Sequence, residues 1–381
     1  MKRLRLVLAG MLVSALGDGM SLVAVAWLAL QIAPDGQEGV WTGISVAAYA
    51  LPAPIGAALL ARWMRRLPAA RLVTADATLR AVALGAAGAL AITGRLDPVA
   101  YACLLALSSL LHAWGTAGAY TLVAEHFPAE KRLAGNALVS AFAQVSIVVG
   151  PAVAGGLAAL AGPGWVIAAD AATWAVLALT AWTVPTRPVG EAEAGGWRTI
   201  RDRPALLGLI AVTCVFFFLY GPVEVALPVL VAGDLHGSAG LLGLYWTVFG
   251  IGATVGAASA ALLRRLPPWT VVVVIIIGWG AALLPVGLSA AIVPGLIGMA
   301  AGGLIYGPFT AITTGLFQTA TPPEALSRVL ATRAAIQTPS ASLGTLLGGP
   351  LVTLAGARPT LVLSALLTIG LGVAAGAGRR S

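Results

Sequence analysis

Hydrophobic residues along this chain form long continuous runs, and short stretches between the runs hold most of the polar residues. A helix that crosses a bilayer needs about 20 mostly apolar residues. The runs are continuous rather than alternating, which excludes a transmembrane barrel. We therefore predict an all-α integral membrane protein with twelve transmembrane helices. Their predicted ranges are Leu6–Ile32, Val40–Ala61, Leu72–Ile92, Pro98–Val123, Leu133–Leu160, Gly164–Thr186, Ala205–Ala232, Leu241–Leu263, Thr270–Leu288, Ile292–Thr319, Ser327–Leu354 and Thr360–Ala377.

The composition narrows the class further. Of the 381 residues, 59% are hydrophobic and 9% are charged, against about 25% charged in an ordinary soluble domain. Too few polar residues are present to cover a soluble fold, which excludes a cytosolic globular enzyme and a disordered chain. The two cysteines, Cys103 and Cys214, both lie in apolar runs and do not indicate a disulfide scaffold.

The net charge of +8 carries information about topology. The basic residues form scattered short clusters and no continuous stripe, so we expect no nucleic-acid partner. With the N-terminus inside, 19 of the 22 basic residues, Arg333 among them, fall on the cytosolic side. Arg95 and Arg358 fall outside, and Arg80 lies within the third span. The positive-inside rule then predicts a multi-pass protein of the cell membrane with both termini in the cytosol.

An internal repeat divides the chain. At a spacing of 194 residues the fifth predicted span matches the eleventh without gaps, and Arg65-Arg66-Leu67-Pro68 recurs 199 residues later. The matched spans point the same way, so we expect two parallel six-helix bundles at 1–186 and 204–381, joined by a cytosolic linker at 187–203, in a monomer. The matched residues include Pro128 and Pro322, Glu130 and Glu324, Ser146 and Ser340, Gly150 and Gly344, and Gly155 and Gly349.

Five short segments carry a family resemblance. They are Ser14–Gly19, Pro128–Leu138, Gly150-Pro151 with Gly155-Gly156, Gly221–Pro228 and Tyr306–Phe309. With these segments in order, the whole chain resembles the major facilitator superfamily, and most closely its bacterial multidrug and macrolide-type exporters. The resemblance implies two six-helix halves that rock about a central cavity, with a small-molecule substrate in the bilayer.

One segment departs from the family pattern. The loop after the second span resembles the family's cytosolic motif of a glycine, an aspartate and several arginines. Arg62, Arg65 and Arg66 match that motif, but Ala57 stands at the glycine position and Ala61 at the aspartate position. The resemblance implies a gating role for the three arginines, and the missing aspartate puts the usual cytosolic latch in doubt.

Ionisable residues inside a membrane are costly, and each is a functional candidate. Asp18 lies about 18 Å along the first span, near the bilayer middle. An apolar site disfavours the charged form of a carboxyl group, so Asp18 could exchange protons near neutral pH; the alternative is a structural hydrogen bond to a neighbouring helix. Glu224 lies between Pro222 and Pro228, which we expect to open the seventh helix. It would face the cavity or be paired at the outer rim.

The remaining candidates have plainer interpretations. Asp76 and Arg80 are one helical turn apart, so we expect a self-neutralising pair with a gating or structural role. Asp170 is a pathway candidate that could instead reach interfacial water at the outer end of its span. Gly150-Pro151 and Gly155-Gly156 resemble the family's antiporter motif, which implies outward pumping; ordinary close packing of helices is the alternative.

Several activities lack their motifs. The chain has no phosphate-binding loop for ATP, no residues at metal-site spacing and no nucleophile–base set, so we expect neither an enzyme with catalytic residues nor a cofactor or metal. We predict a secondary active transporter that exports amphipathic small molecules in exchange for protons. The alternatives are an exporter of a specific metabolite or siderophore, and a transporter-like receptor without flux.

Overall fold

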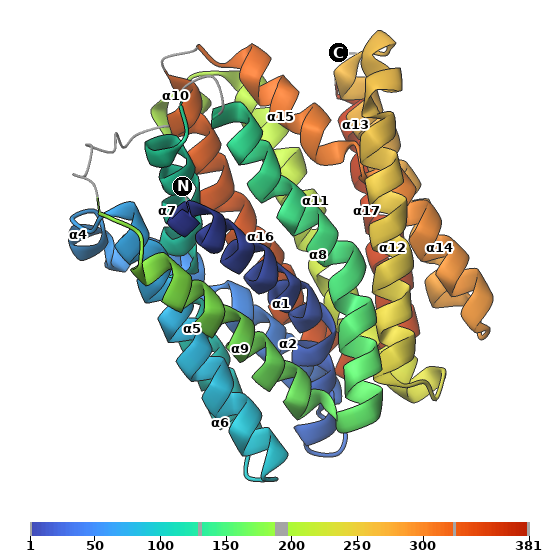
Figure 1. Ribbon diagram of the computed structural model, residues 1–381. Helices are drawn as coiled ribbons and strands as arrows, with labels where there is room; N and C mark the ends of the chain where they lie inside the picture. Colours follow the sequence, from blue (N-terminus) through green and yellow to red (C-terminus); the bar gives the residue numbers. More distant parts are fainter. Residues whose placement is uncertain (1, 129–131, 187–196, 323–324, 379–381) are drawn as a thin grey trace. The chain divides into compact units, whose positions relative to one another are not determined.

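The computed structural model of this chain describes residues 2–128, 132–186, 197–322 and 325–378, and the regular structure of these residues is helical (Figure 1). Parts of three predicted features lie outside the described residues. They are the middle of the Pro128–Leu138 segment with Glu130 and Lys131, residues 187–196 of the linker, and the terminal Arg379 and Arg380.

The predicted spans of the first repeat are helical, and two of them are split. The second span divides where α3 begins at Pro52, a residue without a backbone N–H, and the fourth divides before His112. The helices are α1 (Lys2–Ile32), α2 (Glu38–Ala50), α3 (Pro52–Leu59), α4 (Ala61–Met64), α5 (Ala69–Ile92), α6 (Pro98–Ser109), α7 (His112–His126), α8 (Arg132–Ala161) and α9 (Pro163–Trp182).

The second repeat follows the same order. The tenth span divides at Gly307 and Pro308, as the fourth span does in the first repeat. Its elements, with α10 in the linker, are α10 (Trp197–Arg201), α11 (Pro204–Val229), η2 (Leu230–Asp234), α12 (Ala239–Ser259), η3 (Ala260–Arg265), α13 (Pro268–Leu288), α14 (Ile292–Tyr306), α15 (Phe309–Ala320), α16 (Leu326–Ala355) and α17 (Ala357–Ala377).

Prolines set several helix starts. The helices α6, α9, α11 and α13 each begin at a proline, where the missing N–H is one that a helix leaves unpaired anyway. Asp97 also caps α6, because its carboxylate accepts hydrogen bonds from the backbone N–H groups of Val99 and Ala100, both at 3.0 Å. Short polar connections with such signals explain why the apolar runs and the helices coincide so closely.

The chain forms two packed units. The first contains Met1–Asp35, Ile44–Ala192 and Ser238–Thr247, and the second contains Gly36–Gly43, Glu193–Gly237 and Val248–Ser381. Each unit therefore includes the first turns of a helix, α12 or α2, whose remainder belongs to the other unit.

Helix packing repeats from one unit to the other. In the first unit α1 packs on α8 and α9, and α5 packs on α9. In the second unit α11 packs on α16 and α17, and α13 packs on α17. These pairs are the same spans counted from the start of each repeat, so the two six-helix bundles are pseudo-symmetric, as the sequence repeat predicts.

Glycine contacts hold the first and fifth helices of each repeat together. A Cβ atom built on Gly150 of α8 would lie 2.5 Å from the Cα atom of Gly19 on α1. In the second unit a Cβ on Gly221 of α11 would lie 2.4 Å from the carbonyl carbon of Gly344 on α16. A side chain at either crossing would force the helices apart, so small residues are required there.

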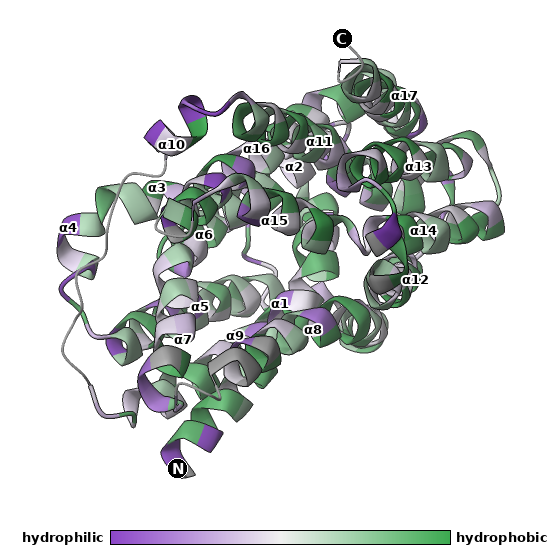
Figure 2. Ribbon diagram, turned by 90° about the horizontal axis from the view of Figure 1, so that it is seen from above, coloured by the Kyte–Doolittle hydropathy of each residue, from purple (hydrophilic) through white to green (hydrophobic). Residues whose placement is uncertain are grey.

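Among the described helices, eleven segments have the length and apolar content to cross a membrane. These segments cover every predicted span except the eleventh. Figure 2 shows hydrophilic residues gathered at α4, α10 and the start of α1. The eleventh span is present as the 30-residue α16, but polar residues such as Gln337, Thr338 and Ser340 lower its apolar content. Arg333 lies within α16 and is buried.

Candidate functional site

The first unit brings three polar side chains together from three helices. Asp18 of α1 accepts hydrogen bonds at Oδ1 from the Tyr49 hydroxyl of α2 and from Arg80 Nη1 of α5, both at 2.9 Å. Arg80 Nη1 also donates to Tyr49 Oη at 3.0 Å. The Asp18 side chain is 34% exposed and the Arg80 side chain 2%. Asp18 is therefore a solvent-accessible carboxylate held by a buried cation.

The expected ion pair of Arg80 with Asp76 on the same helix is present, but the hydrogen-bonded ion pair is with Asp18, which we did not expect. Arg80 Nε lies 3.7 Å from Asp76 Oδ1, and both of these atoms are buried without a hydrogen-bond partner in the described structure. The guanidinium carbon also lies 4.5 Å from the ring centroid of Trp174, a cation–π contact. The cation thus lies between two carboxylates and bonds firmly to one of them.

His112 extends the cluster. Its Nδ1 lies 3.6 Å from Asp76 Oδ2, and its ring meets Trp174 edge to face with centroids 6.3 Å apart. His112 of α7 therefore contacts a carboxylate of the neighbouring helix α5. A protonated His112 would give Asp76 a positive neighbour of its own.

Asp170 lies deeper than predicted. It is fully buried on α9, where it accepts a hydrogen bond from Ser21 of α1 at 2.5 Å and another from Thr173 at 3.3 Å. Gly17 allows this approach, since a Cβ there would collide with the Asp170 carboxylate. The expectation that Asp170 could reach interfacial water is wrong, because α9 packs that side chain against α1.

A cavity of about 280 Å³ opens onto this cluster. Asp18, Asp76 and His112 supply its acidic and imidazole lining, and the rest of the lining is mostly apolar. A carboxylate, a second carboxylate and an imidazole around one space can bind and pass on a proton. The other lining residues are Met11, Ser14, Ala15, Val73, Gly115, Thr116, Ala119, Tyr120, Val139, Phe142, Ala143, Trp174 and Leu177.

The antiporter-like glycines differ in their surroundings. A Cβ built on Gly155 would lie 2.9 Å from the Cα atom of Gly240 at the start of α12, whereas one on Gly156 would meet nothing within 4 Å. Gly150 lies at the α1 crossing, and Pro151 lies inside α8, which continues through it. Arg62, Arg65 and Arg66 are exposed on and just after the short helix α4.

Glu224 is partly buried in the second unit and accepts a hydrogen bond from the Thr345 hydroxyl of α16 at 2.9 Å. We expected Pro222 and Pro228 to open the helix around it. Instead α11 continues to Val229 and ends in the wide turn η2. Neighbouring helices can support a proline inside a transmembrane helix, so the helix need not break.

Aromatic rings occupy the equivalent of the Asp18 cluster in the second unit. Trp279 of α13 follows Arg80 by 199 residues, the spacing of the Arg-Arg-Leu-Pro repeat. Its ring centroid lies 5.8 Å from that of Tyr220 on α11 and 5.4 Å from that of Phe249 on α12. The same three spans therefore meet through charged groups in one repeat and through aromatic rings in the other.

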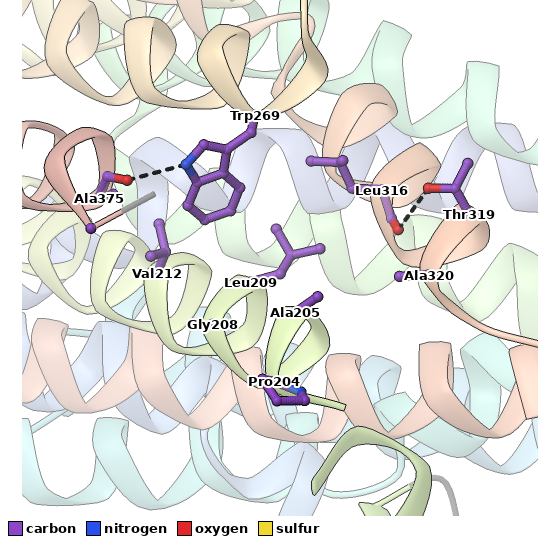
Figure 3. A pocket seen from close by; sticks show the side chains of 11 residues that line it. Pro204, Ala205, Gly208, Leu209, Val212, Trp269, Leu316, Thr319, Ala320 and Ala375 are labelled. Atoms are coloured by element: carbon purple, nitrogen blue, oxygen red, sulfur yellow. Dashed lines mark hydrogen bonds between the residues drawn. The ribbon is translucent and has the colours of Figure 1, made fainter. Parts of the chain in front are cut away.

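The second unit also has an apolar cavity of about 560 Å³ between α11, α13, α15 and α17. Figure 3 shows the Trp269 ring at its wall, with the indole N–H donating to the Ala375 carbonyl at 3.1 Å. No ionisable side chain of the described residues lines this cavity, and its described lining suits an apolar group.

Sequence reasoning missed several partners in these sites. Tyr49, Ser21 and Thr345 are neutral residues of predicted membrane spans, and only the packing shows that each bonds a carboxylate. Within the described residues no group of three or more His, Cys, Asp or Glu side chains is placed to hold a metal ion.

Comparison with known proteins gives a consistent result. The family model described as "Major Facilitator Superfamily" matches residues 7–345. The multidrug efflux pump Tap of Mycobacterium tuberculosis is 29% identical over 401 residues, with 97% of this chain and 92% of that protein covered. An uncharacterized MFS-type transporter of Sinorhizobium fredii is 29% identical over 275 residues, covering 68% and 67%. The solved nucleoside transporter NupG has a TM-score of 0.77 at 15% identity and covers 99% of both chains, which shows a shared fold.

Proposed function

Because this chain belongs to the major facilitator superfamily, we propose that it exports amphipathic small molecules across the cell membrane in exchange for protons. Membership makes it a membrane transporter and not an enzyme. The drug-like substrate, the proton and the direction of transport are the proposed parts. The observation that carries the proposal is Asp18, an accessible carboxylate bonded to a buried arginine.

A proton and Arg80 compete for the same carboxylate. When Asp18 is charged, Arg80 Nη1 bonds to it and links α5 to α1. A proton on Asp18 removes the charge that holds Arg80, and Asp76, 3.7 Å from Arg80 Nε, is the nearest remaining carboxylate of the cluster. Proton binding thus weakens a contact between two helices, and proton release restores it.

The substrate class is supported by several features together. The relatives named above include a multidrug efflux pump, and the described cavities are lined mainly by apolar residues. An amphipathic molecule fits a mostly apolar pocket with few polar groups. An exporter of one specific metabolite or siderophore is the second candidate, and a receptor without flux is the third.

The topology belongs to the same proposal. We place both termini and the linker at 187–203 in the cytosol, with transport bundles at 1–186 and 204–381 and small-residue contacts at Gly150 and Gly155 guiding their motion. The charge distribution of the sequence supports this orientation.

The test is a flux assay in proteoliposomes with an imposed pH gradient and a panel of lipophilic dyes. We expect the wild type to accumulate dye against its gradient and Asp18→Asn to lose uphill transport, because asparagine keeps the size and cannot titrate. Glu224→Gln is tested in parallel as the second candidate. If both variants keep uphill export and its pH dependence, proton coupling through these residues is refuted.

A further inference from the structure

Four charged side chains are buried among the residues that the structure describes: Asp76, Arg80, Asp170 and Arg333. The first three belong to the first unit, where Arg80 has carboxylates nearby. Arg333 is the one in the second unit, and no carboxylate of the described residues lies within ion-pair distance of it. A buried charge without a counter-charge costs several kcal/mol, so Arg333 requires an explanation.

Neutral groups surround the Arg333 guanidinium. Its Nε donates to Gln337 Oε1 at 3.0 Å, Nη1 donates to Thr314 Oγ1 at 2.9 Å and Nη2 donates to Thr313 Oγ1 at 3.1 Å. Its carbon also lies 4.8 Å from the ring centroid of Phe317. Arginine has five N–H donors, and these bonds use three. The side chain is held in place with donors to spare and its charge uncompensated.

Gln337 adds another donor. Arginine can only donate hydrogen bonds, so the oxygen of the Gln337 amide must face Arg333 and its Nε2 must face away. That Nε2 atom is buried without a hydrogen-bond partner in the described structure. Arg333 and Gln337 therefore form a pair rich in donors that lacks a negatively charged acceptor.

The internal repeat relates this pair to residues that line a cavity in the first unit. At the spacing of 194 residues, Arg333 corresponds to Val139 and Gln337 to Ala143. Both Val139 and Ala143 line the cavity onto which Asp18 opens in the first unit. The pair also belongs to α16, the one predicted span that falls short of the others in apolar content. Polar faces of membrane helices point to protein partners or water-filled cavities.

From these observations we propose that Arg333 and Gln337 bind the anionic group of the exported molecule. The substrate class is then an amphipathic molecule with a carboxylate, sulfonate or similar acid group. The oxygens of that group accept hydrogen bonds from the free N–H groups of Arg333 and from Nε2 of Gln337, and they supply the missing negative charge. This inference rests on the proposed export function and narrows its substrate.

The test uses two dyes with the same ring system. One is 8-anilinonaphthalene-1-sulfonate, which carries a sulfonate, and the other is N-phenyl-1-naphthylamine, which has none. Binding to the purified full-length protein in detergent is measured by energy transfer from its tryptophans, with protein-free micelles subtracted. We expect Arg333→Gln to weaken binding of the sulfonated dye by about tenfold to a hundredfold, the effect of losing a charged hydrogen bond, and to leave the uncharged dye unaffected.

Further variants guard against misfolding. Arg333→Lys keeps the charge without the fork geometry and should lose less, and Gln337→Leu should weaken only the sulfonated dye. The matched control is Arg358→Gln, which removes an arginine paired with Asp234 in the same unit and should leave both dyes bound. Binding of the uncharged dye shows that each variant is folded.

Two results overturn the inference. One is a wild type that does not bind the sulfonated dye, and the other is equal binding of that dye by wild type, Arg333→Gln and Gln337→Leu. If the same wild-type protein then exports the uncharged dye uphill, the proposed export function is retained and only the anion site is refuted. Absence of uphill export for every dye in the panel would refute export, whatever the binding measurements show.

Discussion

Arg80 is the cation that Asp18 and Asp76 of the first unit share. Its nitrogens lie 2.9 Å from Asp18 and 3.7 Å from Asp76, and its side chain is 2% exposed. Without Arg80, α5 would supply no positive charge to balance these two carboxylates. Substituting Arg80 therefore tests the role of the cluster in stability, whereas substituting Asp18 tests its role in proton coupling.

We predict that Arg80→Gln destabilises the protein by about 3–5 kcal/mol, the usual cost of removing one partner of a buried ion pair. Thermal unfolding in detergent should show a clearly lower midpoint temperature. Arg71→Gln is the matched control, since Arg71 is exposed and packs over the Trp182 ring at 4.1 Å; its effect should stay below about 1 kcal/mol. Equal midpoints for the two variants would contradict the prediction.

The same cluster allows a rescue experiment. Adding Asp18→Asn to Arg80→Gln removes one of the two carboxylate charges that the first substitution leaves without Arg80, so the double variant should recover part of the lost stability. Purely additive losses would mean that Asp18 and Arg80 do not interact in the folded protein.

The ionisable residues of this site were predictable, and their partners were not. Asp18, Asp76, Arg80 and Asp170 stand out because each interrupts an apolar run. Which acid Arg80 bonds depends on how α1 approaches α5, and the spacing along α5 favoured Asp76 instead. Tyr49 gave no signal, because a tyrosine in an apolar helix is equally at home in a hydrophobic contact.

At the scale of helices, α8 contains two adjacent glycines, of which one contacts another helix closely and the other does not. We predict that Gly155→Leu stops transport while the protein still reaches the membrane, because a side chain there would collide with Gly240 of α12. Gly156→Leu should transport normally, since nothing lies within 4 Å of a Cβ at that position. Dye efflux from cells, normalised to membrane-inserted protein, measures both.

Two results would count against this prediction. Normal efflux by Gly155→Leu would show that transport does not require the close helix contact at Gly155. Equal loss in both variants would indicate that leucine at this depth disturbs α8 itself rather than its contact with α12.

Most helix limits could be read from the apolar runs, and the interruptions inside the runs could not. The breaks at Pro52, His112 and Gly307 lie inside segments that still have the length and apolar content of a single membrane span. Conversely, α11 runs through Pro222 and Pro228, since the packing around it tolerates the lost donors. A proline in a membrane helix thus signals a break only in the context of its neighbours.

For the whole molecule, orientation is the property most open to direct test. In a background with Cys103 and Cys214 replaced by serine, we predict that an impermeant thiol reagent outside intact cells labels cysteines introduced at Gln37 and Ser238. A cysteine at Asp202 should react only after the cells are opened. The reason is the concentration of Lys and Arg in the loops on the other side. External labelling at Asp202 would reverse the topology.

The pseudo-symmetric packing was predictable because the repeat is visible in the sequence. The chemical difference between the repeats was not, since it depends on which residues meet in space. Arg80 and Trp279 occupy matching places with opposite character, and the contacts of Arg333 with Thr313 and Thr314 become evident only when α16 packs on α15.

The exchange of helix starts between the units has a consequence for biosynthesis. Gly39, near the start of α2, packs against Gly349 of α16, and a Cβ on Gly39 would lie 2.9 Å from the Gly349 carbonyl oxygen. These residues are about 310 positions apart in the sequence. At about 5–20 residues per second of translation, the nascent α2 waits roughly 15 to 60 seconds before its partner leaves the ribosome. During that interval lipid must cover the glycine face, so insertion of the early helices precedes, and cannot depend on, the contact that later fixes α2.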